Sequence, residues 1–395
     1  MGRRLGPSAK TGYLMTNIDF DHLTGITPFL AMEIFAKASE LERRGRDIIH
    51  LEFGEPDFAT PPVIADAAIR AIRNSQTRYT DTRGIDSFRE AVVQKYRKTY
   101  GVEISASSIL TSSGSSILLY MAMRLLVPPG DELIVTDPSY ACYANLARIG
   151  GIKTVEIELR LEEGFLLDVS KVKKAIGPRT KAILINSPTN PTGIVFPDDT
   201  LKELAELGIP IISDEIYGDL IYEGPKSSML NFTENCVVLN GLSKYYAMTG
   251  WRLGYMILNP AWVNVASYLN QNMMISASQF VQQAGTAAIN DADCACRKMA
   301  LEFDKRRKFL LKRLKESGLD PQYTPNAAFY VLFRYPNQKR GSFDVSLDIL
   351  EKTGVALTPG IDFGKNGEGF LRFSYANSLE NIDEAVKRLQ RYFLP

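Results

Sequence analysis

Between residues 62 and 258, short apolar runs rich in β-branched residues alternate with amphipathic stretches of helical period. This alternation is typical of a mostly parallel sheet, because the connections between parallel strands place helices over both of its faces. The predicted strands are residues 109–112, 132–136, 154–157, 182–186, 210–213, 237–240 and 253–258. Helical patterns lie between them, for example at residues 87–100, 116–127 and 201–207. The predicted fold class is therefore α/β, with a mostly parallel sheet covered by helices.

The C-terminal part of the chain has a different pattern. A long helical pattern leads into two strand-like runs and a final amphipathic helix, at residues 278–317, 329–333, 370–374 and 379–392. A chain of 395 residues commonly holds two domains, since one domain takes roughly 100 to 200 residues. We expect a large domain at residues 61–290 and a smaller α+β domain at residues 291–395, with residues 1–60 as an N-terminal arm and part of the small domain.

The overall charge favours a small ligand. Lys and Arg number 46 and Asp and Glu number 45, so a net charge of +1 gives no reason to expect nucleic acid or a membrane as partner. The N-terminus lacks a long apolar run, so we expect neither a secretory signal nor a membrane span. A cytoplasmic location follows as the expectation.

The sequence offers little for imidazole or metal chemistry. His22 and His50 are its only two histidines, and both have the ordinary explanation of a surface or core residue. The cysteines lack the spacing of a zinc site and are expected to be reduced packing residues; they are Cys142, Cys236, Cys294 and Cys296. We therefore expect no metal and a proton carrier other than histidine.

Three polar segments follow predicted strands. Residues 186–193 read Asn-Ser-Pro-Thr-Asn-Pro-Thr-Gly, residues 213–217 read Ser-Asp-Glu-Ile-Tyr, and residues 241–255 contain Lys244 and Arg252. Each alone has an ordinary explanation, as a Pro-rich turn, a strand-end carboxylate or a loop lysine. Ligands of such sheets bind beyond the carboxyl ends of the strands, so the three segments together predict one shared crevice.

The residue types in this crevice suit a pyridine aldehyde phosphate. Lys244 supplies an amine that condenses with the aldehyde and can then carry a proton. A carboxylate at Asp214 keeps the pyridine nitrogen protonated, so that the ring accepts electrons. Tyr217 and Asn190 can donate hydrogen bonds to the ring oxygen.

With these motifs, the chain resembles the class I and II aminotransferases of pyridoxal-phosphate fold type I, from about residue 26 to the C-terminus. The resemblance implies that Lys244 forms the Schiff base, that Asp214 faces the pyridinium nitrogen, and that residues 61–290 bind the cofactor. It implies an enzyme that moves an amino group between an L-amino acid and a 2-oxo acid by a ping-pong mechanism.

The phosphate of the cofactor needs an anion site. Ser243 and Arg252 flank Lys244 and can hold it, the arginine through paired charged hydrogen bonds. The turn at residues 112–116 ends a predicted strand and opens a helix, which presents free N–H groups to an anion. A plain helix N-cap is the ordinary alternative. The resemblance implies Gly114, Ser115 and Ser116 as phosphate contacts.

Two tyrosines acquire roles from the resemblance. Tyr140 matches an aromatic residue that stacks on the cofactor ring, a contact worth about 0.5 to 1.5 kcal/mol beyond burial. It has the alternative of an ordinary core tyrosine. Tyr79 matches a residue that reaches the phosphate of the neighbouring subunit. The resemblance thus implies a homodimer with active sites at the subunit interface.

An amino-acid substrate brings a carboxylate. Arg372, at the end of a predicted strand, matches the arginine that grips this group through two parallel bonds, with a surface arginine as the alternative. Gly54 matches a glycine whose backbone approaches the same carboxylate, and Asn190 is expected beside it. Because Gly54 and Arg372 lie outside the predicted large domain, closure of the small domain over the substrate is expected.

The sequence does not determine which side chain the substrate carries. Some bacterial aspartate aminotransferases have a lysine where this chain has Ser115, which argues against strict specificity for aspartate unless Arg83, Lys365 or a partner residue replaces it. Phe29 and residues 272–274 are candidate pocket walls, and neutral amino acids are open as substrates.

Three other functions are weighed. β-Elimination, C–S lyase and cyclisation enzymes share the scaffold, and a panel of amino acids with 2-oxo acids would separate them by whether a new amino acid or only ammonia appears. A regulator that senses pyridoxal phosphate would need a DNA-binding domain, for which the short N-terminus leaves no room. A nicotinamide dehydrogenase is disfavoured, because no predicted strand is followed by G-x-G-x-x-G.

Overall fold

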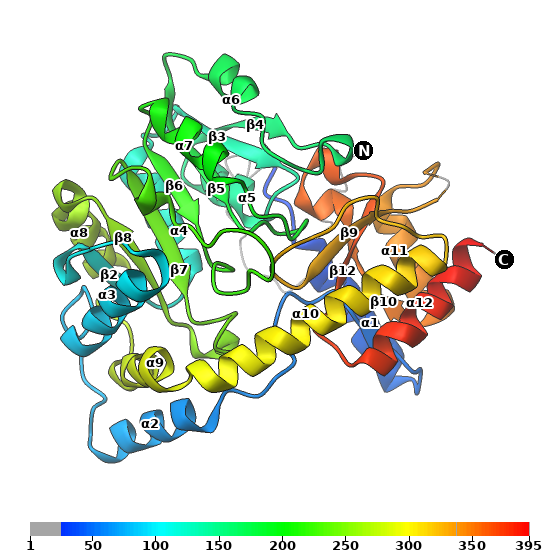
Figure 1. The fold of residues 1–395 in the computed structure, drawn as a ribbon, viewed down its shortest axis with the longest axis horizontal. Helices are drawn as coiled ribbons and strands as arrows, with labels where there is room; N and C mark the ends of the chain where they lie inside the picture. Colours follow the sequence, from blue (N-terminus) through cyan, green and yellow to red (C-terminus); the bar gives the residue numbers. More distant parts are fainter. Residues whose placement is uncertain (1–24, 337, 395) are drawn as a thin grey trace, which may run out of the picture.

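A seven-stranded sheet forms the centre of the larger part of the molecule (Figure 1). The computed structural model describes residues 25–336 and 338–394, so His22 and the first part of the expected N-terminal arm lie outside the described residues. The strands are β2 (Ile109–Ser112), β3 (Glu132–Asp137), β4 (Lys153–Glu158), β5 (Thr180–Asn186), β6 (Ile211–Asp214), β7 (Cys236–Gly241) and β8 (Gly254–Leu258). Their order is β2-β8-β7-β6-β5-β3-β4, and only β8 runs antiparallel to its neighbours, so the predicted mostly parallel sheet is confirmed.

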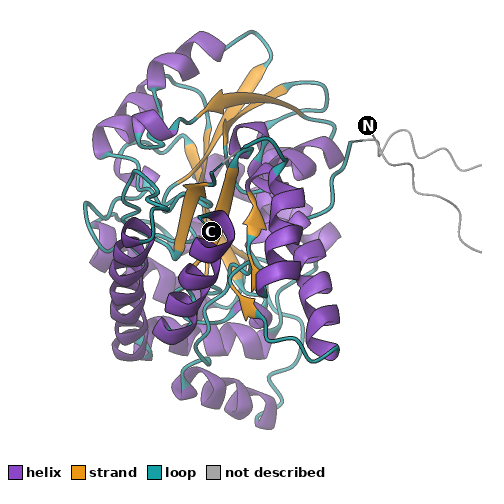
Figure 2. Ribbon diagram, turned by 90° about the vertical axis from the view of Figure 1, so that its right-hand side faces the viewer, coloured by secondary structure: helices purple, strands orange, loops and turns teal. Residues whose placement is uncertain are grey.

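Helices cover the sheet, as the side view also shows (Figure 2). They are α2 (Pro62–Arg73), α3 (Asp86–Tyr100), α4 (Ser115–Leu126), α5 (Cys142–Ile149), α6 (Val169–Ala175), α7 (Asp198–Glu206), α8 (Val263–Met273) and α9 (Gln279–Asp291). Side chains of the central strands alternate between two apolar clusters: in β5, Ile183 and Ile185 belong to one and Leu184 to the other. Because both faces are buried, the central strands are apolar throughout, which made them predictable.

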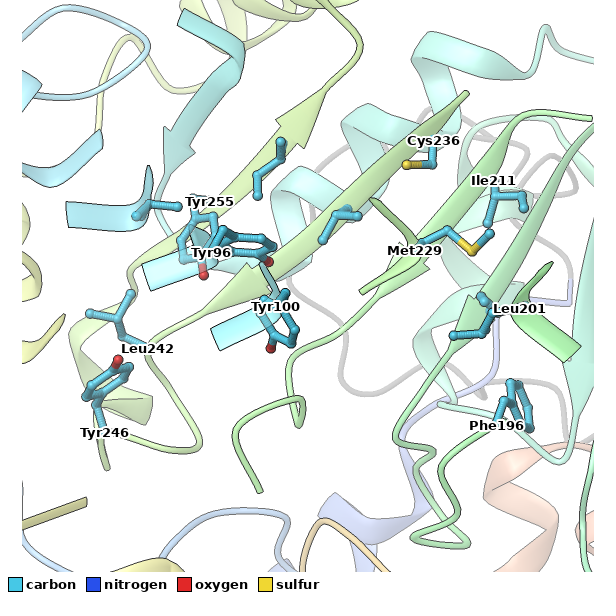
Figure 3. Packing of buried hydrophobic residues seen from close by; sticks show 14 of the residues in the cluster. Tyr96, Tyr100, Phe196, Leu201, Ile211, Met229, Cys236, Leu242, Tyr246 and Tyr255 are labelled. Carbon is cyan, nitrogen blue, oxygen red and sulfur yellow. The ribbon is translucent and has the colours of Figure 1, made fainter. Parts of the chain in front are cut away.

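Figure 3 shows the first of these clusters from close by. At one end of it lie the tyrosines Tyr96 and Tyr100 of α3 with Tyr255 of β8, and at the other end lies Met229 beside Ile211 of β6. The rings of Tyr96 and Tyr255 meet edge to face, with centroids 6.3 Å apart. Helix α3 is thereby packed on β8, the antiparallel strand next to the β2 edge of the sheet.

The smaller part of the molecule is built from segments near both ends of the described chain. Its elements are α1 (Leu30–Arg43), β1 (Ile49–His50), α10 (Asp293–Glu316), β9 (Tyr330–Arg334), α11 (Ser342–Thr353), β10 (Val355–Ala356), β11 (Thr358–Pro359), β12 (Phe370–Ser374) and α12 (Leu379–Phe393). Strand β1 pairs in parallel with β10, and β11, β12 and β9 form an antiparallel sheet. A small α+β unit built from the N-terminal segment and the C-terminal part is therefore confirmed.

The helical pattern at residues 278–317 is not one helix. It divides at Ala292, whose backbone leaves the helical conformation at φ −95° and ψ 0°, and Asp293 then lies in the first turn of α10, where a negative charge is favourable. Helix α9 packs on α2 and α3, whereas α10 packs on α12 (Figure 1). The two helices therefore serve different parts of the fold, while the domain limits proposed from sequence stay a prediction. Within the described ranges, no helix is long and apolar enough to cross a membrane.

Candidate active site

A cavity of about 330 Å³ lies where the carboxyl ends of β5, β6 and β7 meet the small sheet. Eleven of the thirteen predicted site residues line it, all except Gly114 and Tyr79, and they come from segments far apart in the sequence. These are Gly54, Ser115, Ser116, Tyr140, Asn190, Asp214, Tyr217, Ser243, Lys244, Arg252 and Arg372. The predicted crevice beyond the strand ends is thus present.

Lys244 lies just after β7. Its Nζ donates a hydrogen bond to the backbone oxygen of Gly54 at 2.6 Å. Burial lowers the pKa of Lys244 to about 8, and the positive charges of Arg372 and Arg252 act in the same direction. About a tenth of the amine is therefore neutral at pH 7, far more than for an ordinary lysine, and the neutral amine is the form that attacks an aldehyde.

Asp214 ends β6 and is buried. Its Oδ2 accepts a hydrogen bond from the hydroxyl of Tyr143 at 2.9 Å, and its Oδ1 accepts one from the backbone N–H of Ile216 at 3.2 Å. Burial raises the pKa of Asp214 to about 6, so the carboxylate is mostly charged at neutral pH. Tyr143 was not predicted, although its spacing of three from Tyr140 at a helix start is a signal that the two share a face.

Asn186 fastens the loop after β5 to the neighbouring strand. Its Nδ2 donates to the backbone oxygen of Asp214 at 2.8 Å, and its Oδ1 accepts from the backbone N–H of Asn190 at 2.8 Å. The predicted motif begins at Asn186 but gives it no role. Its amide positions Asn190 relative to Asp214.

Tyr217 is buried and meets Tyr330 of β9, with 2.8 Å between the hydroxyl oxygens. Burial raises the pKa of Tyr217 well above its ordinary value, so the phenol keeps its proton and can donate a hydrogen bond. The guanidinium of Arg372 lies 4.4 Å from the ring centroid of Tyr330. Tyr330 was missed because it occurs in an apolar strand run, where a tyrosine has no distinguishing mark.

An anion cradle lies at the start of α4. Gly114 precedes this helix with φ +97°, a conformation that favours glycine, and a Cβ there would lie 2.6 Å from Nη2 of Arg252. Arg252 has φ +55°, also in the left-handed region. The guanidinium therefore lies against the turn whose N–H groups begin the helix. Two sources of positive potential converge beside Ser115 and Ser116.

Arg372 is a buried cation, which excludes the surface alternative. Its Nη1 donates to Oδ1 of Asn190 at 3.0 Å, and its Nη2 donates to the backbone oxygen of Glu52 at 2.5 Å and to Oγ1 of Thr358 at 3.1 Å. Its Nε is buried and has no hydrogen-bond partner among the described residues. Gly54 lies nearby, and a Cβ at Gly54 would collide with the hydroxyl of Tyr330.

His50 lies next to Glu52, which lines the cavity. Its Nδ1 lies 2.7 Å from Oε1 of Glu52, and this hydrogen bond raises the pKa of His50 to about 9. The same residue, Glu52, offers its backbone oxygen to Arg372. His50 thus neutralises a buried carboxylate and supports the segment that holds Arg372, as part of the structure.

Several predicted residues lie elsewhere. Tyr79 is 79% exposed and does not line the cavity of the single chain. Arg83 pairs with Asp81 at 3.4 Å and Lys365 with Glu156 at 2.8 Å, both outside the cavity. Residues 272–274 also lie outside it, whereas Phe29 lines it.

The residues present fit pyridoxal phosphate. A buried amine, a buried carboxylate and an anion cradle are what the aldehyde, the pyridine nitrogen and the phosphate require, and Lys244, Asp214 and Arg252 provide them. The unpaired N–H of Arg372 leaves a donor for a substrate carboxylate.

The chain belongs to the class I and II aminotransferases, whose family profile matches residues 46–389. It is therefore a pyridoxal-phosphate-dependent transaminase. It is 40% identical to a (5-formylfuran-3-yl)methyl phosphate transaminase of Methanocaldococcus jannaschii over 94% of this chain and 98% of that one. It is 38% identical to an aspartate aminotransferase of Pyrococcus horikoshii over 91% of this chain and 93% of that one. The solved aspartate aminotransferase of Thermus thermophilus with maleate superposes with a TM-score of 0.90 at 34% identity, over 95% of this chain and 100% of that one.

The lowered pKa of Lys244 predicts how the cofactor-free enzyme takes up pyridoxal phosphate. Only the neutral amine attacks the aldehyde, so the rate should fall about tenfold per pH unit below a midpoint of about 8 and level off above it. Stopped-flow absorbance after mixing measures this rate. Lys244→Ala is the control and should show no absorbance change from reaction of the amine with the aldehyde. A midpoint near the ordinary lysine pKa of about 10.4 would contradict the effect of burial.

Proposed function

We propose that this transaminase moves an amino group between an L-amino acid and a 2-oxo acid in two half-reactions, with Lys244 as its catalytic residue. The observation that carries the proposal is the meeting of the Lys244 amine, the Asp214 carboxylate and the Arg372 guanidinium in one cavity. Pyridoxal phosphate, when bound, supplies an electron sink for the pair of electrons left by the substrate's α-proton.

Each residue has a task toward this group. Lys244 would join the aldehyde, and Asp214, oriented by its hydrogen bond from Tyr143 at 2.9 Å, would keep the ring nitrogen protonated. Tyr217 and Asn190 would donate hydrogen bonds to the ring oxygen, and Tyr140 would pack on the ring. The phosphate is held by Ser115, Ser116, Ser243 and Arg252, at the start of α4.

Lys244 also moves the proton. With the cofactor and an amino acid bound, the free amine of Lys244 would take the proton from the substrate α-carbon and hold it for return. A lysine with a pKa of about 8 suits this work, because it gives up and takes protons near working pH. Arg372 grips the substrate carboxylate together with Asn190 and the backbone at Gly54, which fixes the α-carbon beside Lys244.

We further propose a homodimer in the cytoplasm. Tyr79 supports the dimer: it is a large aromatic residue that is 79% exposed, on the segment before α3. Its predicted task is to reach the phosphate in the partner's cavity. The site is then complete only when two chains associate.

Borohydride trapping tests the role of Lys244. Reduction of the loaded enzyme should fix the pyridoxyl group on one peptide, the one that contains Lys244, as read by mass spectrometry. Lys244→Ala should keep its fold and lose at least about a thousandfold in rate, since both covalent and acid–base catalysis are removed. Product analysis should find a new amino acid; ammonia as the main product would point to elimination. A label on another lysine would sink the proposal.

Arg372→Lys tests the carboxylate grip. The substitution keeps the charge but removes the fork, so kcat/KM for the amino donor should fall about tenfold to a hundredfold, mainly through KM. Arg334→Lys is the matched control, because Arg334 lies on the neighbouring strand β9, is exposed and pairs with Glu162 at 3.1 Å. Equal effects of the two substitutions would contradict the assignment.

Subunit mixing tests the dimer. Lys244→Ala and Tyr79→Ala chains, each impaired alone, should regain about a quarter of wild-type activity after equal mixing and refolding, since half the dimers hold one intact site. Mixing Lys244→Ala with Arg372→Ala should give no recovery, because these residues belong to the same cavity of one chain. Failure of the first mixture to gain activity would count against Tyr79.

A further inference from the structure

Helix α1 begins without a cap of its own. Phe29 occupies the N-cap position and makes no side-chain hydrogen bond to the helix. The missing acceptor comes from Asp362, in the 3₁₀ helix η7 (Gly360–Phe363). The backbone N–H of Leu30 donates to its Oδ1 at 2.8 Å, and that of Ala31 to its Oδ2 at 3.4 Å. A carboxylate 332 residues away thus satisfies the first N–H groups of α1.

The first turn of α1 is part of the cavity wall. Phe29, Ala31 and Met32 line the cavity, and so do Asp362 and Phe363. Met32 is 52% exposed, so it is an apolar group at the open side of the cavity wall. The two bonds that Asp362 accepts therefore help to fix the position of this wall, together with the packing of α1 on α11.

The segment that carries Asp362 is itself anchored to the large sheet. The backbone N–H of Ser139, just after β3, donates to the backbone oxygen of Phe363 at 2.8 Å. The carboxylate of Asp137 at the end of β3 accepts from Nδ2 of Asn366 at 3.0 Å. A continuous set of hydrogen bonds thus leads from β3 through η7 to α1, with Asp362 as its last member.

The charges around the cavity also matter. Among the described residues that line it, three are cations, namely Lys244, Arg252 and Arg372, and the proposed function uses each of them. The wall formed by α1 and η7 instead carries apolar and aromatic groups beside the Asp362 carboxylate. The ring of Phe29 lies 6.1 Å from that of Tyr140.

We propose that Asp362 is a positioning residue that sets the preference for the substrate side chain. It holds the first turn of α1 as an apolar wall, and its negative charge disfavours a second carboxylate. The enzyme therefore favours amino acids with uncharged, apolar or aromatic side chains over dicarboxylic ones. This inference rests on the proposed function, because it concerns the side-chain end of the same cavity.

Half-reaction kinetics with three donors test it. In wild type, kcat/KM should be higher for phenylalanine than for aspartate. In Asp362→Ala, kcat/KM for phenylalanine should fall about tenfold, mainly through KM, whereas alanine, whose methyl group does not reach the wall, should change less than about twofold. Phe29→Ala removes the wall directly and should lower the ratio of phenylalanine to alanine in the same way.

Asp362→Asn separates the role of Asp362 in holding the start of α1 from the effect of its negative charge. The amide oxygen can still accept from Leu30, so phenylalanine should be rescued to near the wild-type value. Loss of the charge should raise kcat/KM for aspartate relative to phenylalanine by about tenfold.

Asp168→Ala is the control. Asp168 caps α6 by accepting from the backbone N–H of Ser170 at 2.9 Å, and it does not line the cavity. Its loss should lower the melting temperature without changing donor preference. Equal losses for phenylalanine and alanine in Asp362→Ala, or a wild-type preference for aspartate, would overturn the inference. Absence of transamination by wild type with every donor would instead overturn the proposed function.

Discussion

The buried guanidinium of Arg372 ties the two parts of this molecule together. Removing such a charge from water costs several kcal/mol unless acceptors replace the lost solvent. Here the acceptors come from three separate segments: Asn190 in the loop after β5, the backbone of Glu52 after β1, and Thr358 in β11. Because β12 carries Arg372 itself, the bonds fix the small sheet relative to the strand ends of the large one. The cavity exists only in this arrangement.

Burial moves the pKa values of the two central ionisable groups toward each other. Desolvation disfavours charge, so it lowers the pKa of Lys244 to about 8 and raises that of Asp214 to about 6. The hydrogen bond from Tyr143 favours the charged carboxylate and opposes part of this rise. A lysine that can lose its proton and a carboxylate that keeps its charge are thereby present together at neutral pH.

The sheet could be predicted from sequence because its strands are buried on both faces. Strand β2 has the predicted limits, residues 109–112, and the polar residues just after β5, β6 and β7 converge as expected. The break at Ala292 could not be predicted, since the apolar period continues through it. Tyr330 and Asp362 could not be found either, because their roles come from contacts with Tyr217 and with the start of α1. Such contacts between distant segments leave no local pattern.

The two sides of the cavity are formed by different kinds of structure. Lys244, Asp214 and the anion cradle come from strand ends and the helix start beside them, which the packed sheet holds in place. The opposite wall comes from the first turn of α1 and from η7, joined to the sheet by a few hydrogen bonds such as that between Ser139 and Phe363. Relatives of this chain are named for different substrates, and the wall proposed to set side-chain preference lies on elements outside the packed sheet, whereas the proposed chemical centre lies on it.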